Sequence, residues 1–116
     1  MSRIYVCGPM SGYPDLNVDA FRTAAWQLQR LGHSSVVPHD VEVAQHEEPC
    51  PAGPPVTTQS GHSVACFLRA DLTALLDCDG IYVLNGWEAS VGARLEVQVA
   101  AACGIPIEFE RFREAE

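Results

Sequence analysis

The chain has few basic residues, and it has no apolar run long enough to cross a membrane. Its 116 residues include 7 Lys and Arg against 15 Asp and Glu, which gives a formal net charge of -8. This balance is poorly suited to a long nucleic acid, and no run approaches the roughly 20 apolar residues of a membrane span. We therefore expect neither a long nucleic acid nor a membrane as a partner. One small anion or nucleotide stays open, because a few backbone N–H groups can bind one phosphate against an acidic average.

Two further absences concern targeting and cysteine chemistry. The apolar run at residues 3–7 breaks at Gly8-Pro9, and it lacks the length and cleavage pattern of a secretory signal. The five cysteines are odd in number and include no Cys-x-x-Cys pair. Several lie in apolar runs, where a thiol packs as a small hydrophobe. These features favour a cytoplasmic protein with reduced thiols.

The length and composition favour one folded domain over residues 1–116. Hydrophobic residues make up 47% of the chain and charged residues 19%, which is typical of a packed domain and too apolar for a disordered one. A chain of this length can enclose a single core. We therefore expect one functional site.

Strand-like and helix-like segments alternate along the chain. We expect strands at 3–7, 34–38, 80–85 and 105–109, and helices at about 17–31, 63–78 and 91–103. This alternation predicts an α/β fold with three layers, in which helices cover a doubly wound parallel sheet of about four to five strands. Ligands bind beyond the carboxyl ends of the strands in such sheets. That edge would hold residues 8–12, the loop after Pro38, and residues 86–90.

A long irregular segment, about residues 39–62, separates the second strand from the second helix. A loop of this length in so small a domain is usually functional or mobile, and we interpret it as a lid or a partner-contact loop. Two His/Cys pairs of equal spacing occur there, and together they could bind zinc tetrahedrally: His46, Cys50, His62 and Cys66. The spacing is less specific than two Cys-x-x-Cys pairs, so this zinc site is an alternative to a metal-free protein.

A glutamate in the third predicted helix lies on a face of small side chains. The neighbours of Glu96 at three and four positions are Gly92, Ala93, Val99 and Ala100, which leave space around its carboxylate. We expect Glu96 to point toward the ligand edge, where the helix N-terminus would favour its ionised form. An ionised carboxylate can attack an anomeric carbon. The alternative is a surface glutamate that pairs with Arg94 or stays in solvent.

Asp71 and Tyr5 are further candidate catalytic residues. Asp71 interrupts the apolar face of the second helix, and it could share a cleft with Glu96. Two carboxylates in one cleft can divide the roles of acid and nucleophile. The alternative is a structural aspartate bonded to Arg69 or to loop backbone. Tyr5 could donate its hydroxyl to a neighbouring carboxylate, or it could simply pack in the core.

The ligand edge supplies the candidate binding residues. In the turn after the first strand, N–H groups and a hydroxyl could bind a phosphate or a sugar, although a plain structural turn would need the same glycines. Trp87 could stack on a base or cover the core. The expected binding residues are Gly8, Pro9, Met10, Ser11, Gly12, Trp87, Ser90 and Gly92.

Taken together, these motifs resemble the nucleoside 2-deoxyribosyltransferase-like family, including its small uncharacterised branch and the related deoxynucleoside 5'-monophosphate N-glycosidases. The resemblance covers most of the chain outside residues 39–62. It depends on four motifs in order: residues 4–12, Asp71-Leu72 followed by Asp79, residues 92–96, and residues 104–107.

The resemblance implies a flavodoxin-like (Rossmann-like) fold and an enzyme, a hydrolase or a transferase of nucleotide metabolism. Such an enzyme acts at the N-glycosidic bond of a (deoxy)nucleoside or its 5'-monophosphate. The resemblance also implies a homo-oligomer, a dimer or higher, in which neighbouring chains complete the pocket. No metal or organic cofactor is implied.

The resemblance further assigns roles to the candidate residues. Glu96 would attack C1' and form a covalent intermediate, Tyr5 would orient it, and Asp71 would contact the base and help to protonate it. Residues 8–12 would line the sugar or phosphate pocket. The alternative is a nucleotide-binding or regulatory module of the same fold, in which Glu96 and Asp71 only hydrogen-bond a ligand.

Overall fold

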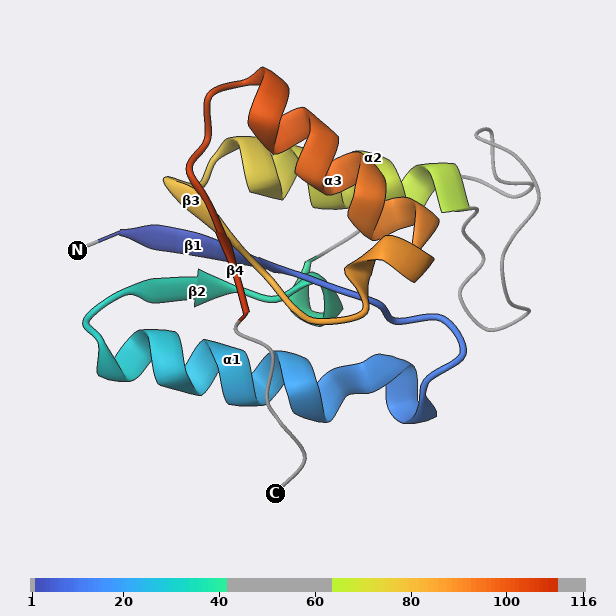
Figure 1. Cartoon of the computed structure of the whole chain (residues 1–116), viewed down its shortest axis with the longest axis horizontal. Coiled ribbons are helices and arrows are strands. Elements are labelled where there is room, and N and C mark those ends of the chain that lie inside the picture. The colour runs from blue at the N-terminus through green and yellow to red at the C-terminus, as the bar shows by residue number, and fades with distance from the viewer. Residues whose placement is uncertain (1, 42–63, 111–116) are drawn as a thin grey trace.

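The computed structural model describes residues 2–41 and 64–110. Its helices and strands alternate as the sequence predicts (Figure 1). The elements are β1 (Arg3–Cys7), α1 (Val18–Arg30), β2 (Ser34–Val36), α2 (Val64–Leu76), β3 (Gly80–Val83), α3 (Val91–Ala102) and β4 (Ile107–Phe109). Three short 3-10 helices lie between them: η1 (Pro14–Asn17), η2 (Pro38–Asp40) and η3 (Trp87–Ala89).

The described strands form one parallel sheet with the order β2-β1-β3-β4. Tyr5 in β1 lies opposite Val36 in β2 and Ile81 in β3. The strand order reverses between β1 and β3, because the chain adds β2 on one side of β1 and β3 on the other. The carboxyl ends of β1 and β3 therefore flank the crevice in which doubly wound sheets bind ligands.

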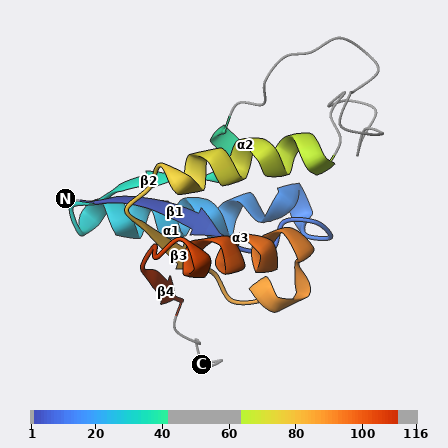
Figure 2. The same cartoon turned by 90° about the horizontal axis from the view of Figure 1, so that it is seen from above.

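Helices cover both faces of the sheet, which confirms the predicted three-layer α/β fold. One face packs against α1, where Val6 meets the buried side chains of Phe21 and Leu28. The other face packs against α2 and α3, where Tyr5 and Cys7 share a buried cluster with residues of both helices. Figure 2 shows α2 and α3 side by side over the sheet, with α1 beneath it. Successive residues of β1 thus point alternately to the two cores.

Local signals explain most of the element ends. α1 ends just before Gly32, which has φ of +92°, and α3 ends before Gly104 with φ of +71°. Glycine adopts this left-handed conformation at little cost, so it commonly terminates helices. At the other end of α3, the hydroxyl of Ser90 accepts a hydrogen bond from Ala93 N at 3.2 Å, which caps the helix.

The structure shortens three predicted elements. The expected strand at 34–38 ends at Val36, and Pro38 begins η2 instead. The expected strands at 80–85 and 105–109 are Gly80–Val83 and Ile107–Phe109. Most of the expected loop at 39–62 lies outside the described residues. Among the described residues, no helix has both the length and the apolarity needed to cross a membrane.

Candidate functional site

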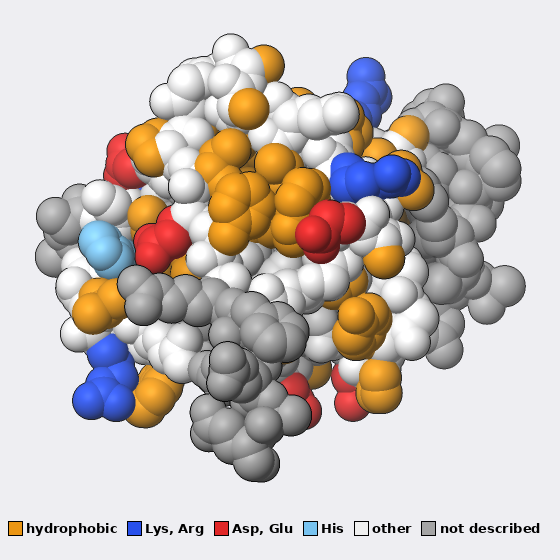
Figure 3. Space-filling view, in the orientation of Figure 1, with side chains coloured by type: hydrophobic (Ala, Val, Ile, Leu, Met, Phe, Trp, Pro, Cys, Tyr) orange, Lys and Arg blue, Asp and Glu red, His pale blue; other side chains and the backbone are white. Residues whose placement is uncertain are grey.

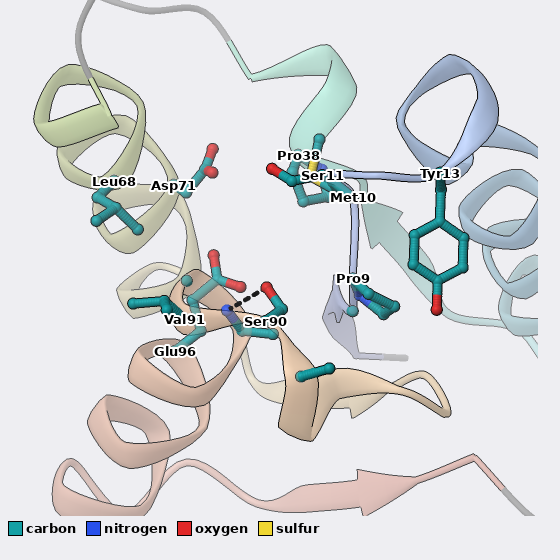
Figure 4. Close-up of a pocket in the computed structure, with 14 residues that line it drawn as sticks. Pro9, Met10, Ser11, Tyr13, Pro38, Leu68, Asp71, Ser90, Val91 and Glu96 are labelled. Atoms are coloured by element: carbon teal, nitrogen blue, oxygen red, sulfur yellow. Dashed lines mark hydrogen bonds between the residues drawn. The ribbon is translucent and has the colours of Figure 1, made fainter. Parts of the chain in front are cut away.

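A pocket of about 430 Å³ opens at the carboxyl edge of the sheet, between the β1–α1 turn and the helices α2 and α3 (Figure 4). We call it the carboxyl-edge pocket. Its lining consists of residues 8–11, Tyr13, Pro38, Leu68, Asp71, residues 89–93 and Glu96. The structure therefore brings the first turn, α2 and the start of α3 together around one space, as the topology predicts.

Glu96 is the buried carboxylate of this pocket. Its side chain projects from α3 and is 5% exposed. The hydroxyl of the fully buried Tyr5 donates a hydrogen bond of 2.6 Å to Glu96 Oε2. This partner lies on β1, so the predicted alternative of a surface glutamate beside Arg94 does not describe Glu96.

Burial raises the pKa of Glu96, while hydrogen bonds from Tyr5 and Cys7 act in the opposite direction. The sequence led us to expect that the helix N-terminus would favour the ionised form. However, Glu96 is the sixth residue of α3, and the field of the helix falls off within its first turn. The loss of water around the carboxylate therefore outweighs the helix, and the two hydrogen bonds are what support its negative charge.

Asp71 faces the same pocket from α2. Figure 4 shows its carboxylate and that of Glu96 directed into the space between their helices. Burial, and then the charge of Glu96, raise the pKa of Asp71 to about 7. Asp71 is therefore close to half protonated at neutral pH. An acid with this pKa beside a second carboxylate is an arrangement that can divide proton donation from nucleophilic attack.

Gly8 lets the first turn pack closely against Leu84, just beyond the end of β3. A Cβ at this position would lie 2.8 Å from Leu84 Cβ, which is too close for any side chain without a shift of the backbone. Pro9, Met10 and Ser11 follow Gly8 along the wall of the carboxyl-edge pocket. On the opposite wall, Ser90 uses its oxygen to cap α3 (Figure 4), so its hydroxyl proton remains for a ligand.

Two expected binding residues do not line the carboxyl-edge pocket. Trp87 packs on Phe109 with ring centroids 5.5 Å apart and contacts the core beneath α3. Gly12 has φ of +85°, so glycine at this position allows the left-handed backbone of the turn. Gly92 lines the pocket as expected, and a Cβ there would meet Leu68 Cδ2 at 3.5 Å.

Several lining residues are absent from the sequence-based set. Leu68 precedes Asp71 by three residues on α2, so helical spacing could have found it. Tyr13 lies just beyond the first turn and ends against Gly86, whose Cβ position is 3.1 Å from the tyrosine hydroxyl. After Tyr13, the chain turns through three consecutive left-handed residues of η1, Asp15–Asn17. The amino-acid sequence does not predict a left-handed backbone at residues other than glycine.

The structure does not test the alternative zinc site, because most of its expected ligands lie outside the described residues. His46, Cys50 and His62 lie outside the described residues, and Cys66 is buried in α2. Within the described ranges, no group of three or more His, Cys, Asp or Glu side chains is arranged to hold a metal ion.

The fold and the paired carboxylates define a doubly wound α/β protein with an acidic pocket at the carboxyl edge of its sheet. The chain belongs to the family described as "Domain of unknown function (DUF4406)", whose model matches residues 2–109. A search of curated proteins finds no match.

Two solved structures are similar to this chain. A conserved protein from Enterococcus faecalis V583 shares 24% identity at a TM-score of 0.62, over 94% of this chain. The chain spans only 62% of that protein. A 2-deoxyribosyltransferase from the psychrotolerant bacterium Bacillus psychrosaccharolyticus shares 15% identity at a TM-score of 0.62, over 96% of this chain and 77% of the enzyme. At these identities the similarity confirms the fold relationship that the motifs predict.

Proposed function

We propose that the chain cleaves or transfers at the N-glycosidic bond of a (deoxy)nucleoside or its 5'-monophosphate, with Glu96 as the nucleophile. The observation that carries this proposal is the pairing of two unlike carboxylates in one pocket. Glu96 is buried and accepts a 2.6 Å hydrogen bond from Tyr5. Asp71 faces it with a pKa raised to about 7.

In the first step, the ionised Glu96 carboxylate attacks C1' of the sugar. A C1'–O bond forms while the C1'–N bond breaks, and its electron pair passes to the base nitrogen. Protonated Asp71 gives its proton to the departing base, so the base leaves neutral. Tyr5 donates to one oxygen of Glu96, which leaves the other oxygen for the attack.

In the second step, water or another base resolves the glycosyl ester. Water attacks C1' and gives its proton to the now ionised Asp71, while the C1'–O bond to Glu96 breaks and restores the carboxylate. A second base that attacks through nitrogen gives a new nucleoside instead. The two carboxylates, the substrate and the attacking water or base supply every proton and electron pair, so we propose that the reaction uses no metal or organic cofactor.

The shape and lining of the carboxyl-edge pocket support this substrate class. Its volume of about 430 Å³ lies in the range of sites that enclose small ligands. Pro9, Met10, Tyr13 and Leu68 offer apolar surface to a flat base. Ser11 and Ser90 offer hydroxyls to the sugar or a phosphate.

The experiment is chromatographic detection of free base after the protein is incubated with deoxynucleosides and their 5'-monophosphates, with and without an acceptor base. Base release without an acceptor supports a hydrolase, and release only with an acceptor supports a transferase. No release from any compound in either condition contradicts the proposal.

One observation favours a second candidate, a nucleotide-binding module without turnover. Burial raises the pKa of Glu96, and a protonated glutamate donates a hydrogen bond rather than attacking carbon. For this candidate, calorimetry would show that the parent protein and Glu96→Gln both bind nucleotide, and neither would release base. Base release by the parent that is lost in Glu96→Gln, with binding retained, would instead support catalysis.

We further propose that the chain is a single-domain cytoplasmic protein that assembles as a homo-oligomer. The family resemblance suggests assembly, and Figure 3 shows apolar side chains gathered near the centre of the face that carries α3 and β4. Val91 and Phe109 are 72% and 48% exposed, and exposed apolar groups of this kind often contact another chain. Light scattering after size-exclusion chromatography tests the assembly, and a monomer at all concentrations contradicts it.

A further inference from the structure

Cys7 lies directly beside the Glu96 site, although no role has been assigned to it. It follows Tyr5 by two residues in β1, so both side chains point to the same face of the sheet. Both are fully buried, and both belong to the cluster that includes Ala93 and Ala100 of α3. β1 therefore presents a hydroxyl and a thiol side by side to the helix that carries Glu96.

The thiol of Cys7 bonds the helix that carries Glu96. Cys7 Sγ donates to the carbonyl oxygen of Ala93 at 3.6 Å, and Ala93 precedes Glu96 by three residues, nearly one turn of α3. The thiol also lies close enough to the Glu96 carboxylate to interact with it, and this interaction raises the pKa of Cys7 and lowers that of Glu96. A thiol carries a single proton, so it donates fully to one acceptor at a time.

We propose that Cys7 is a positioning residue for Glu96, whose thiol provides a second donor to the carboxylate while it holds the neighbouring turn of α3 against β1. This inference deepens the proposed function, since it rests on Glu96 as the nucleophile.

The chemistry of a buried carboxylate explains why a second donor matters. A carboxylate offers about four acceptor sites, and Tyr5 occupies one of them. Leaving the remaining sites without a partner in a buried position costs free energy. A thiol is a weak donor, so it supports the negative charge without binding the carboxylate so tightly that attack is suppressed.

Cys7 is suited to donating rather than reacting. Burial and the nearby Glu96 raise the pKa of its thiol, so it keeps its proton and stays a donor. Reactive cysteines have the opposite character, with exposure and a lowered pKa. Among the described residues, the titratable groups that face Glu96 are Tyr5 and Cys7 from β1 and Asp71 from α2.

The test compares Cys7→Ala, which removes the donor, with Cys7→Ser, which keeps one. Cys78→Ala is the matched control, because Cys78 is also buried and its thiol donates to Ala74 O at 3.3 Å. Unlike the pKa of Cys7, that of the Cys78 thiol is influenced by Arg3, Asp77 and Asp79 and not by Glu96. Thermal unfolding of each variant measures the cost of lost packing separately.

The first readout is the titration of the Glu96 carboxyl by carbon NMR on protein labelled at glutamate, with the signal assigned through Glu96→Gln. Cys7→Ala should move the midpoint to higher pH, Cys7→Ser should restore it, and Cys78→Ala should leave it in place. An unmoved midpoint in Cys7→Ala overturns the inference. This readout does not depend on turnover, so it separates failure of the inference from failure of the proposed function.

The second readout is kcat/KM for base release against pH. On the acid side of the profile, Cys7→Ala should lower kcat/KM about two- to tenfold, the effect of losing one weak hydrogen bond. The loss should appear in kcat, and Cys7→Ser should recover it. An equal loss at every pH in both Cys7→Ala and Cys7→Ser would show that Cys7 only fills space.

Discussion

At the scale of the residue, the distinctive feature of Glu96 is that neutral donors, and no cation among the described residues, lie beside its buried carboxylate. It is 5% exposed, yet within the described part of the chain its hydrogen-bond partner is the Tyr5 hydroxyl rather than a cation, and the Cys7 thiol lowers its pKa from the same strand. A buried carboxylate paired with Arg or Lys would be held as a fixed charge. Neutral donors leave it freer to change charge during a reaction, which is the behaviour that a nucleophile requires.

We predict that Glu96→Gln abolishes base release while the fold is retained. The amide has nearly the same shape, and its oxygen can accept from Tyr5, so unfolding should occur near the parental temperature. The rate should fall by at least about 1,000-fold, because the covalent route is removed. The measurement is base release by chromatography, with circular dichroism as the control for folding. Parental activity in a folded variant would show that Glu96 is not the nucleophile.

We predict that Asp71→Asn lowers the rate and removes the alkaline decline of the pH profile. In the parent, kcat/KM should fall as Asp71 loses its proton, with its pKa near 7. Asparagine cannot donate that proton, so the rate should drop about 100-fold and the decline near neutral pH should vanish. An unchanged profile would assign Asp71 a structural role.

The same substitution has a consequence for stability. The folded pKa of about 7 lies above the ordinary value of 3.8, so the folded protein holds this proton more tightly than the unfolded chain. The stability that Asp71 contributes is full below about pH 4 and is lost as the pH rises toward and through 7. Asp71→Asn should therefore gain stability relative to the parent between pH 4 and pH 8, as measured by thermal unfolding. A constant difference over this range would contradict the raised pKa.

At the scale of the element, the β1–α1 turn depends on Gly8, whereas the start of α3 depends on the Ser90 cap and not on Gly92. Gly8 and Gly92 differ in the space that is available for a side chain. A Cβ at Gly8 would lie 2.8 Å from Leu84 Cβ, whereas a Cβ at Gly92 would meet Leu68 Cδ2 at an ordinary 3.5 Å. The first turn is therefore fixed by packing against the end of β3, while α3 has room beside its first turn.

We predict that Gly8→Ala destabilises the protein by about 1–3 kcal/mol, since the new methyl group overpacks the contact with Leu84. Gly92→Ala is the matched control. It should keep or raise stability by up to about 1 kcal/mol, because alanine favours the helix over glycine. Denaturant unfolding of the two variants measures both effects. Equal stability of the two would contradict the close contact at Gly8.

The elements also show what the sequence could and could not predict. β1, α1 and α3 could be located because their apolar patterns end at turn residues, such as Gly32 and Gly104. η1 could not, because its left-handed residues include Leu16 with φ of +56°. A side chain with Cβ rarely adopts this conformation without tertiary support. Here Leu16 O bonds the His39 ring at 2.8 Å, a contact between distant residues.

At the scale of the whole molecule, topology explains why the candidate site was largely predictable. Glu96 and Asp71 lie on helices that follow different strands, and the parallel order β2-β1-β3-β4 brings their ends to one edge. Alternation of strands and helices is enough to place that edge. Which side chains turn inward depends on packing, so Tyr13 was missed and Trp87, which packs on Phe109, lies outside the pocket lining.

The central claim is that Glu96 forms a covalent bond to the sugar of a nucleoside. The most direct test is peptide mass spectrometry of protein mixed with an active nucleoside or nucleotide and quenched in acid within the first turnover. We predict that one peptide gains the mass of a single glycosyl group at Glu96, and that Glu96→Gln shows no gain. Base release without any glycosylated peptide, or with the group on another residue, would contradict the account.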